Sequence, residues 1–478
     1  MVTDEPPSLL IRDAEVDGVR RDVRLGRGRV VEIGVGLRPT GDESEVIDAA
    51  EGALIPGLTD HHIHLFATAA DLASTGCGPP RVRTSDQLAG ALRRAAPDEH
   101  GWVRGVRYHE SVAGPLEAVR LDELRADVAV RIQHRSGALW MLNSPAAEAV
   151  GLERAEHPGI ERDGEGRATG RLWRADEWLR SRLPHSYPRT PSLRDLGRLL
   201  AGYGVTAVTD ATPGPAPGAV EAIASAMAVG HLPQHVQLLG APLDTPRSSG
   251  RGPIAGPWKL VLADSDLPTF DELADAVSAA HRVGRPVAVH TVTRESLVLL
   301  LAVLAQTGSL PGDRLEHAAL VPAELIATIR SLGLRVVTQP GFIADRGDDY
   351  LREIPAVDHA DLYRCASLCS ARVPLALSSD APYGPLDPWA VMSSATTRRT
   401  RAGQILNRRE RLSPRQALAG YLSPALSPGA AASRVRPGGP ADLVLLHASM
   451  HEVLRRLDAD LVRLTVIGGR PANESATL

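Results

Sequence analysis

Two histidines near the N-terminus stand at a spacing that suits metal binding. They lie in the segment DHHIH at residues 60–64, which follows an apolar run. In an extended chain, residues i and i+2 point to the same face, so His62 and His64 can share one cation. Neutral imidazole is a standard ligand for zinc-like ions, and an ion with an open coordination position lowers the pKa of water to about 7. The pair therefore predicts a metal site that supplies hydroxide at neutral pH.

Ligand-type side chains also end three other apolar runs farther along the chain, and a fourth run carries a lysine. A single histidine after a strand is more often a hydrogen-bonded core residue, since histidine is intermediate in burial. The carboxyl ends of the strands of a β/α barrel, however, meet on one rim. Six residues are therefore expected to form one metal-binding cluster: His62, His64, Lys259, His290, His317 and Asp380.

Lys259 is the only lysine among the 53 basic residues of the chain. An arginine side chain stays protonated, whereas a buried ε-amine loses its proton readily and reacts with carbonyl carbon. Isolated lysines are mostly exposed, so a surface position without function is the alternative. The apolar segment GPWKLVL around this residue favours a buried, reactive lysine instead.

Eight apolar runs of strand length alternate with amphipathic helical stretches, the order expected for βα units around a parallel sheet. Helical stretches at residues 270–283, 294–306 and 322–332 have lengths that suit crossovers. Eight such units predict an α/β fold, a (β/α)8 barrel of the TIM type. The expected strands are residues 53–60, 205–210, 235–240, 258–263, 286–290, 314–317, 334–338 and 374–378.

The two ends of the chain share short β-like runs broken by glycine and charged turns. Residues 1–55 and 431–478 are expected to form one small β-sandwich domain, and residues 56–430 the barrel domain. The interval 66–193 is too long for one crossover, so we expect an insertion after the first barrel strand. Because this insertion leaves from the carboxyl end of that strand, it should lie over the mouth of the site.

Polar and aromatic side chains of the insertion, with two residues of the barrel, are candidates for contacting a substrate. For each of them ordinary packing or a surface position is the alternative, because a pocket uses few lining residues. An arginine after the fifth strand could favour an anionic substrate group or point to solvent. The candidates are His61, Tyr108, His109, His134, Trp140, Trp173 and Arg294.

Composition and charge are those of an ordinary globular enzyme. The 478 residues are 43% hydrophobic and carry a net charge of -4, which argues against nucleic-acid binding. There is no apolar stretch of membrane-spanning length, and the acidic start at residues 1–7 lacks the layout of a signal peptide, so a cytoplasmic location is expected. Cys77, Cys365 and Cys369 are too few for a disulfide framework, and buried packing is favoured for the last two over metal binding or redox chemistry.

These motifs together resemble the amidohydrolase superfamily, and within it the branch of N-substituted formamide deformylase (amidohydrolase family 3). The segment PGLTDHHIH at residues 56–64 resembles the family's first-strand signature, RLEH at 314–317 its sixth and SDAP at 379–382 its eighth. In the insertion, GIERD at 159–163 and GRL at 170–172 resemble a segment specific to the branch. The resemblance covers nearly the whole chain.

The resemblance implies which residues hold which ion. His62 and His64 would hold the more buried metal together with Asp380, and His290 and His317 would hold the second. The implied cofactors are one or two divalent metal ions, with zinc expected.

The resemblance also implies catalytic roles for Asp380, Lys259 and His317. Lys259 would react with CO2 and bridge the metals as a carbamate, an anionic ligand that an arginine could not form. Asp380 would accept the proton of the attacking water and later deliver it to the leaving nitrogen. The metals would stabilise the oxyanion of the substrate carbonyl.

The expected function is hydrolysis of a carbon–nitrogen bond in a small-molecule amide, formamide, N-acyl compound or cyclic amide. A deaminase with a mononuclear site is one alternative, although the lysine disfavours it, and an inactive scaffold on the same fold is another. The chain departs from the branch pattern at residue 61, which is usually small, at residues 291–294 and at residues 136–138. These departures leave the substrate open, and a homodimer is an option that the sequence does not decide.

Overall fold

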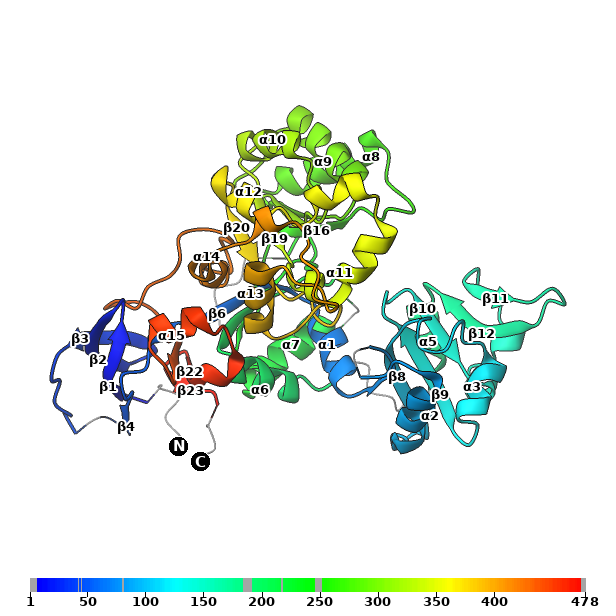
Figure 1. Ribbon diagram of the computed structural model, residues 1–478, viewed down its shortest axis with the longest axis horizontal. Helices are drawn as coiled ribbons and strands as arrows, with labels where there is room; N and C mark the ends of the chain where they lie inside the picture. The colour runs from blue at the N-terminus through cyan, green and yellow to red at the C-terminus, as the bar shows by residue number, and fades with distance from the viewer. Residues whose placement is uncertain are drawn as a thin grey trace. The chain divides into compact units, whose positions relative to one another are not determined.

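The computed structural model describes residues 7–41, 43, 45–79, 81–183, 191–215, 218–245 and 252–473. The chain divides into two compact units (Figure 1). The first contains Met1–Leu65 and Ser192–Leu478, and the second contains Phe66–Pro191. Most of the acidic start and the last five residues of the expected β-domain lie outside the described residues. The expected barrel and the expected β-domain thus share one unit, and the boundaries at 55/56 and 430/431 stay predictions.

Each of the eight expected barrel runs contains a strand of the first unit. The expected first strand at residues 53–60 is wrong as a single element, because the chain changes sheets at Gly57. Gly57 N donates to Asp442 O at 2.8 Å, whereas Leu58 N donates to Gly204 O at 2.9 Å. The strands are β6 (Leu58–Ile63), β13 (Val205–Asp210), β14 (His235–Leu238), β16 (Trp258–Val261), β17 (Val287–Thr291), β18 (Arg314–His317), β19 (Arg335–Thr338) and β20 (Leu375–Leu377).

These strands are all parallel and lie in two sheets rather than in one closed ladder of described residues. One sheet has the order β15-β14-β13-β6, where β15 is Ile254–Ala255, and the other has the order β16-β17-β18-β19-β20. The ladder is interrupted because the short β15 pairs with the edge of β14. Single hydrogen bonds still join the sheets, from Lys259 N to Leu239 O at 3.0 Å and from Asp380 N to His62 O at 2.8 Å. The first unit therefore has a TIM-barrel-like arrangement without a continuous ladder.

The crossover helices begin at well-formed caps. Thr269 and Glu272 form a capping box at the start of α8 (Phe270–Arg282), and Thr293 caps α9 (Arg294–Thr307). Such caps satisfy backbone N–H groups that have no partner within the helix. The expected helix at residues 322–332 begins as a 3-10 turn, η2 (Ala323–Leu325), and continues as α10 (Ile326–Ser331). The remaining helices of this part are α6 (Arg194–Gly202), α7 (Ala219–Ala228), α10 (Ile326–Ser331), α11 (Gly341–Glu353), η3 (Ala356–Asp361), α12 (Cys365–Ser370), α13 (Pro388–Thr397), η4 (Arg408–Glu410) and α14 (Pro414–Ala419).

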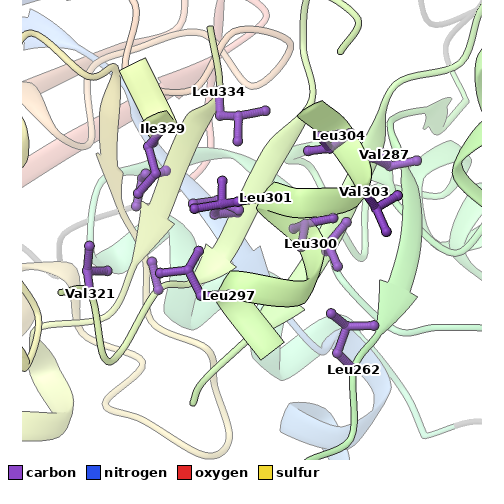
Figure 2. Packing of buried hydrophobic residues seen from close by; sticks show 14 of the residues in the cluster. Leu262, Val287, Leu297, Leu300, Leu301, Val303, Leu304, Val321, Ile329 and Leu334 are labelled. Atoms are coloured by element: carbon purple, nitrogen blue, oxygen red, sulfur yellow. The ribbon is translucent and has the colours of Figure 1, made fainter. Parts of the chain in front are cut away.

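Helix α9 packs on the outer face of the second parallel sheet. Its leucines Leu297, Leu300 and Leu304 lie in one buried cluster with Val287 of β17 and Leu334 before β19 (Figure 2). Residues three and four apart fall on one face of a helix, which is why these leucines face the sheet together. This packing holds β17 and β18, whose carboxyl ends carry His290 and His317, in a fixed layer.

The two chain ends build a second core within the first unit. One four-stranded sheet has the order β3-β2-β1-β4 and the other has the order β23-β22-β21-β5. Leu9 and Val23 of the former share a buried cluster with Leu443 and Val466 of the latter. The two chain ends therefore meet, as their similar pattern of short β-like runs predicts. The sandwich geometry stays a prediction. The elements are β1 (Leu9–Val16), β2 (Val19–Gly26), β3 (Arg29–Gly34), β4 (Glu45–Asp48), β5 (Leu54–Pro56), β21 (Leu443–Leu446), α15 (Met450–Arg455), η5 (Ala459–Leu461), β22 (Val462–Ile467) and β23 (Arg470–Pro471).

The second unit has a six-stranded sheet of its own, in the order β11-β12-β10-β9-β8-β7. Two buried clusters lie in it, one around Tyr108 and Ile132 and one around Trp140 and Leu172. It can thus fold around its own core, which is what an insertion requires. Its elements are α1 (Leu65–Leu72), β7 (Thr75–Gly76), α2 (Ser85–Arg94), β8 (Trp102–Tyr108), α3 (Ala118–Leu124), β9 (Ala129–His134), β10 (Leu139–Leu142), α4 (Ser144–Ala149), η1 (Leu152–Arg154), β11 (Ile160–Arg162), β12 (Ala168–Trp173) and α5 (Asp176–Arg182).

The cysteines are unpaired. Cys77 and Cys365 are buried, and Cys369 is partly buried. Burial raises the pKa of the Cys77 and Cys365 thiols to about 12, so they are protonated, as expected for packing. Among the helices of the described residues, none combines the length and the apolar character needed to cross a lipid bilayer.

Leu300→Ala should lower the free energy of unfolding by about 2–5 kcal/mol, because it leaves a cavity in a closely packed core. Leu300 is fully buried, whereas Val298 on the same helix is 47% exposed. The matched control Val298→Ala should therefore change stability by no more than about 0.5 kcal/mol. Urea unfolding of the three proteins measures both, and equal losses would contradict the proposed packing of α9.

Candidate metal centre

The centre begins at the end of β6, where every residue is buried. His62 is the fifth residue of this strand, and His64 follows the strand directly. Asp60 fixes the end of this strand, since its Oδ1 accepts hydrogen bonds from His62 N at 3.2 Å and Ser379 N at 3.1 Å. Burial raises the pKa of Asp60 to about 6. Asp60 thus ties the end of the first strand to the segment that carries Asp380.

Asp380 lies between three histidines. Its Oδ1 is 3.5 Å from His62 Nε2 and 3.3 Å from His64 Nε2, and its Oδ2 is 3.7 Å from His317 Nδ1. Burial by itself would raise the pKa of this carboxyl group, but the imidazoles of His62 and His317 outweigh burial, and the pKa is lowered. Asp380 and His317 both adopt positive φ, 52° and 69°, a strained region for residues other than glycine that is typical of functional sites.

His317 and His290 extend the cluster from neighbouring strands. The ring centroids of these two residues are 4.4 Å apart, and those of His62 and His317 are 4.8 Å apart. Gln339 Oε1 lies 2.9 Å from His317 Nδ1, and it accepts a hydrogen bond in the tautomer that leaves Nε2 to a cation. Gln339 Nε2 in turn donates to Ser378 Oγ at 3.0 Å, which fixes the orientation of the amide.

A buried chain of charged groups holds the ring of His62. Its Nδ1 contacts Glu316 Oε2, and Glu316 Oε1 pairs with Arg314 Nε. Arg314 Nη2 also donates to His61 O at 3.1 Å. A carboxylate behind a ligating histidine orients the ring and raises its basicity, so Glu316 directs Nε2 of His62 toward Asp380.

Lys259 is buried on β16 beside these charges. Burial lowers the pKa of its amine to about 8, although Glu316 and Asp380 act in the opposite direction. Burial also lowers the pKa of His290 to about 3 and the pKa values of His62 and His317. At neutral pH the imidazoles of His62, His290 and His317 are therefore in the uncharged form that binds metals, whereas the amine of Lys259 is largely protonated and loses its proton near pH 8.

The residues present fit a divalent cation. His62 Nε2 and Asp380 Oδ1 are buried and have no hydrogen-bond partner among the described residues, which is rare for buried polar atoms. His62, His317 and Asp380 each offer one ligand atom, and these atoms lie within 4.8 Å of one another. A cation among them would satisfy both orphaned atoms, and imidazole with carboxylate is a donor set typical of zinc. The structure brings His62, His317 and Asp380 within ligand distance of one another, with His64 beside Asp380 and His290 beside His317. Their binding of a metal is taken up as a proposal below.

Two expected pocket residues of the first unit have protein partners. His61 is fully buried, its Nε2 is 3.1 Å from Ser423 Oγ, and burial lowers its pKa to about 3. Arg294 pairs with Asp358 at 2.7 Å and Asp361 at 3.0 Å. These contacts agree with the packing alternative for both residues, and a role in substrate binding stays a prediction.

The expected pocket residues of the second unit differ in exposure. Tyr108 is buried and donates to Gly114 O at 2.5 Å, and Trp140 is buried and donates from Nε1 to Asp176 at 2.9 Å. Trp173 is 43% exposed and donates to Glu161 at 2.9 Å. His109 and His134 lie side by side, with ring centroids 5.9 Å apart. Their roles toward a substrate also stay predictions.

Sequence reasoning missed three residues that shape the centre: Glu316, Gln339 and Asp60. Glu316 could have been found, because a carboxylate inside an apolar strand motif, RLEH, must have a buried partner. Asp60 carried the same signal within DHHIH. Gln339 follows β19 and had no signal beyond its position at a strand end.

Gln339→Ala should weaken metal binding by about 10–100-fold, because outer partners of metal-ligating histidines typically contribute that much. The substitution removes the acceptor at His317 Nδ1 without touching a ligand. Gln306→Ala, at an exposed position of α9, is the matched control and should bind metal as the wild type does. Competition with a chromophoric chelator measures the affinities, and equal values for the two variants would rule out the orienting role of Gln339.

Lys259→Met should change the pH dependence of stability in the metal-free protein. The pKa of Lys259 is about 8 in the folded state against an ordinary value of 10.5, so the unfolded chain binds more protons between these values. The free energy of unfolding of the wild type should therefore rise relative to that of the variant as the pH increases from about 8 to about 10.5. Denaturant unfolding in the presence of a chelator measures this difference, and parallel curves would show that Lys259 keeps its ordinary pKa.

Known proteins resemble this chain over most of its length. The amidohydrolase family model matches residues 45–472. N-substituted formamide deformylase from Arthrobacter pascens is 25% identical over 485 residues, which cover 89% of each chain. A putative amidohydrolase from Bacillus subtilis (strain 168) is 22% identical over 484 residues, covering 90% of this chain and 86% of the relative.

The fold is also found among solved structures. An uncharacterized metal-dependent hydrolase from Pyrococcus horikoshii OT3 has a TM-score of 0.73 at 19% identity, covering 92% of this chain and 98% of its own. An uncharacterized metal-dependent hydrolase from Pyrococcus furiosus has a TM-score of 0.71. This likeness shows a TIM-barrel-like α/β fold. Because the family model spans both units and the segments that carry the cluster, the chain belongs to the amidohydrolase family.

Proposed function

We propose that this protein is a metal-dependent hydrolase that cleaves a carbon–nitrogen bond in a small amide, formamide, N-acyl compound or cyclic amide. The observation that carries the proposal is the pair of orphaned buried atoms, His62 Nε2 and Asp380 Oδ1, within the cluster of ligand-type side chains. A relative that matches most of the chain is an N-substituted formamide deformylase, which favours the amide and formamide classes.

The centre would hold one or two divalent ions, with zinc as the proposed metal. His62, His64 and Asp380 would hold one ion, and His290 and His317 the second. When bound, such an ion lowers the pKa of water and polarises a carbonyl group.

Asp380 is the proposed general base. Its Oδ1 faces Nε2 of His62 and His64, so this atom is the ligand atom and Oδ2 is left to accept a proton from the attacking water. The same oxygen then delivers the proton to the leaving nitrogen, which departs as a neutral amine. The lowered pKa of Asp380 keeps the carboxylate ionised at neutral pH, as a base requires.

Lys259 is proposed to be carbamylated. Its neutral amine would attack CO2, form a new N–C bond and release one proton, so that a neutral side chain becomes a carbamate anion that could serve as a ligand for both proposed ions. The buried position and the lowered pKa of this amine support the reaction, since only the unprotonated amine is a nucleophile.

Lys259→Arg should abolish turnover while leaving the fold intact, because the guanidinium keeps the charge and the approximate length but cannot form a carbamate. Arg335→Lys, on β19, is the matched control and should retain most of the activity. Activity of zinc-loaded enzyme and thermal unfolding are measured together. Near-normal activity of the arginine variant would overturn the bridging role.

The reaction class is tested with a panel of N-formyl, N-acyl and cyclic imide compounds and zinc-loaded enzyme. Release of formate or another carboxylate together with an amine supports the proposal. Release of ammonia from an aromatic amine would instead identify a deaminase, and a protein that binds no metal after metal-replete expression would be a scaffold.

A further inference from the structure

We propose that the second unit contains a metal site of its own, formed by His109, Glu110 and His134, which takes a zinc-like divalent cation. Each residue offers one ligand atom, and these atoms lie within 4.8 Å of one another. The group lies wholly within Phe66–Pro191. It is therefore separate from the ligand cluster around Asp380, which lies in the first unit.

The sheet topology brings the two histidines together. Strands β8 and β9 are adjacent and parallel, and Tyr108 pairs with His134 in their register. His134 is the last residue of β9, and His109 follows β8 directly. Both imidazoles therefore stand at the carboxyl ends of two neighbouring parallel strands, where Arg135 N donates to Tyr108 O at 2.8 Å.

The same local motif orients both rings. In each case the residue two positions after the histidine is a serine, and its Oγ lies 2.8 Å from the histidine Nδ1, Ser111 for His109 and Ser136 for His134. The backbone N–H of each serine donates to the same Nδ1, Ser111 N to His109 at 3.3 Å and Ser136 N to His134 at 3.1 Å, so each ring is fixed at two points. A cation bound at Nε2 would take the place of the proton on that nitrogen, and the ring proton would move to Nδ1, from which it can donate to the serine hydroxyl.

Glu110 supplies the third ligand. Its Oε2 lies 3.0 Å from His134 Nε2. Two atoms that bind one tetrahedral zinc ion at about 2.1 Å are about 3.4 Å apart, so this spacing needs little change to admit the ion. All three residues are partly exposed, which leaves a path for the ion and room for water as a fourth ligand. Two imidazoles and a carboxylate favour zinc or a similar borderline ion over calcium or magnesium.

The site is tested by counting the Zn²⁺ that the full-length, metal-stripped protein binds. His109→Ala and His134→Ala should each bind one equivalent less than the wild type. His157→Ala is the matched control, because His157 lies in the same unit and accepts a hydrogen bond at Nδ1 from Gly159 N at 3.1 Å but has no part in the group. It should bind as many equivalents as the wild type. The test compares the number of Zn²⁺ ions bound by each variant with the number bound by the wild type, so its outcome does not depend on how many ions bind around Asp380.

Glu110→Gln keeps the shape of the side chain and tests the same metal site if an alanine variant fails to fold. It should weaken binding of the extra equivalent by at least about ten-fold, since even outer partners of ligands contribute that much. Unchanged stoichiometry and affinity in the variants of His109, Glu110 and His134 would overturn the proposal. The same loss in His157→Ala would overturn it as well.

Discussion

A buried carboxylate needs a partner, and the organisation of this centre follows from that requirement. Asp380 and Glu316 are both removed from solvent, where an uncompensated negative charge would be very costly. Glu316 is matched by Arg314 and by the ring of His62. Asp380 faces the imidazoles of His62, His64 and His317. Burial lowers the pKa of His62 and of His317, and one oxygen of Asp380 has no partner among the described residues. Positive charge beside Asp380 comes from the amine of Lys259, whose pKa of about 8 leaves it largely protonated at neutral pH, and a divalent cation would pair the oxygen that has no partner.

Much of this centre could be predicted from the sequence, because ligand residues stand at strand ends and strand ends are marked by apolar runs. His62 and His64 at i and i+2, and His317 and Asp380 at the ends of short runs, were assigned on that basis alone. The roles of Glu316 and Gln339 could not be assigned, because they depend on which strands are neighbours. The run at residues 53–60 was read as one strand, since nothing in its apolar pattern shows that Gly57 leads the chain from one sheet to another.

The aromatic candidates show a different limit of sequence reasoning. Tyr108 and Trp140 combine a large apolar surface with one polar atom, so they suit a pocket and a core equally well. In the structure both are buried in the second unit, and the polar atom of each donates a hydrogen bond to a neighbouring residue. His109 follows β8 and His134 ends β9, and these strands pair only in the folded sheet, so no spacing in the sequence could reveal that Glu110 lies beside His134.

The solitary lysine has a practical consequence for studying the protein in solution. An acylating reagent that is selective for amines has two targets in the whole chain, the α-amino group and Lys259. Since the ε-amine is buried, a reagent in water reaches it only when the surrounding strands open. The rate of its acylation therefore reports the local opening of the structure around β16 at a single atom, and the α-amino group is the one other amine whose reaction must be subtracted.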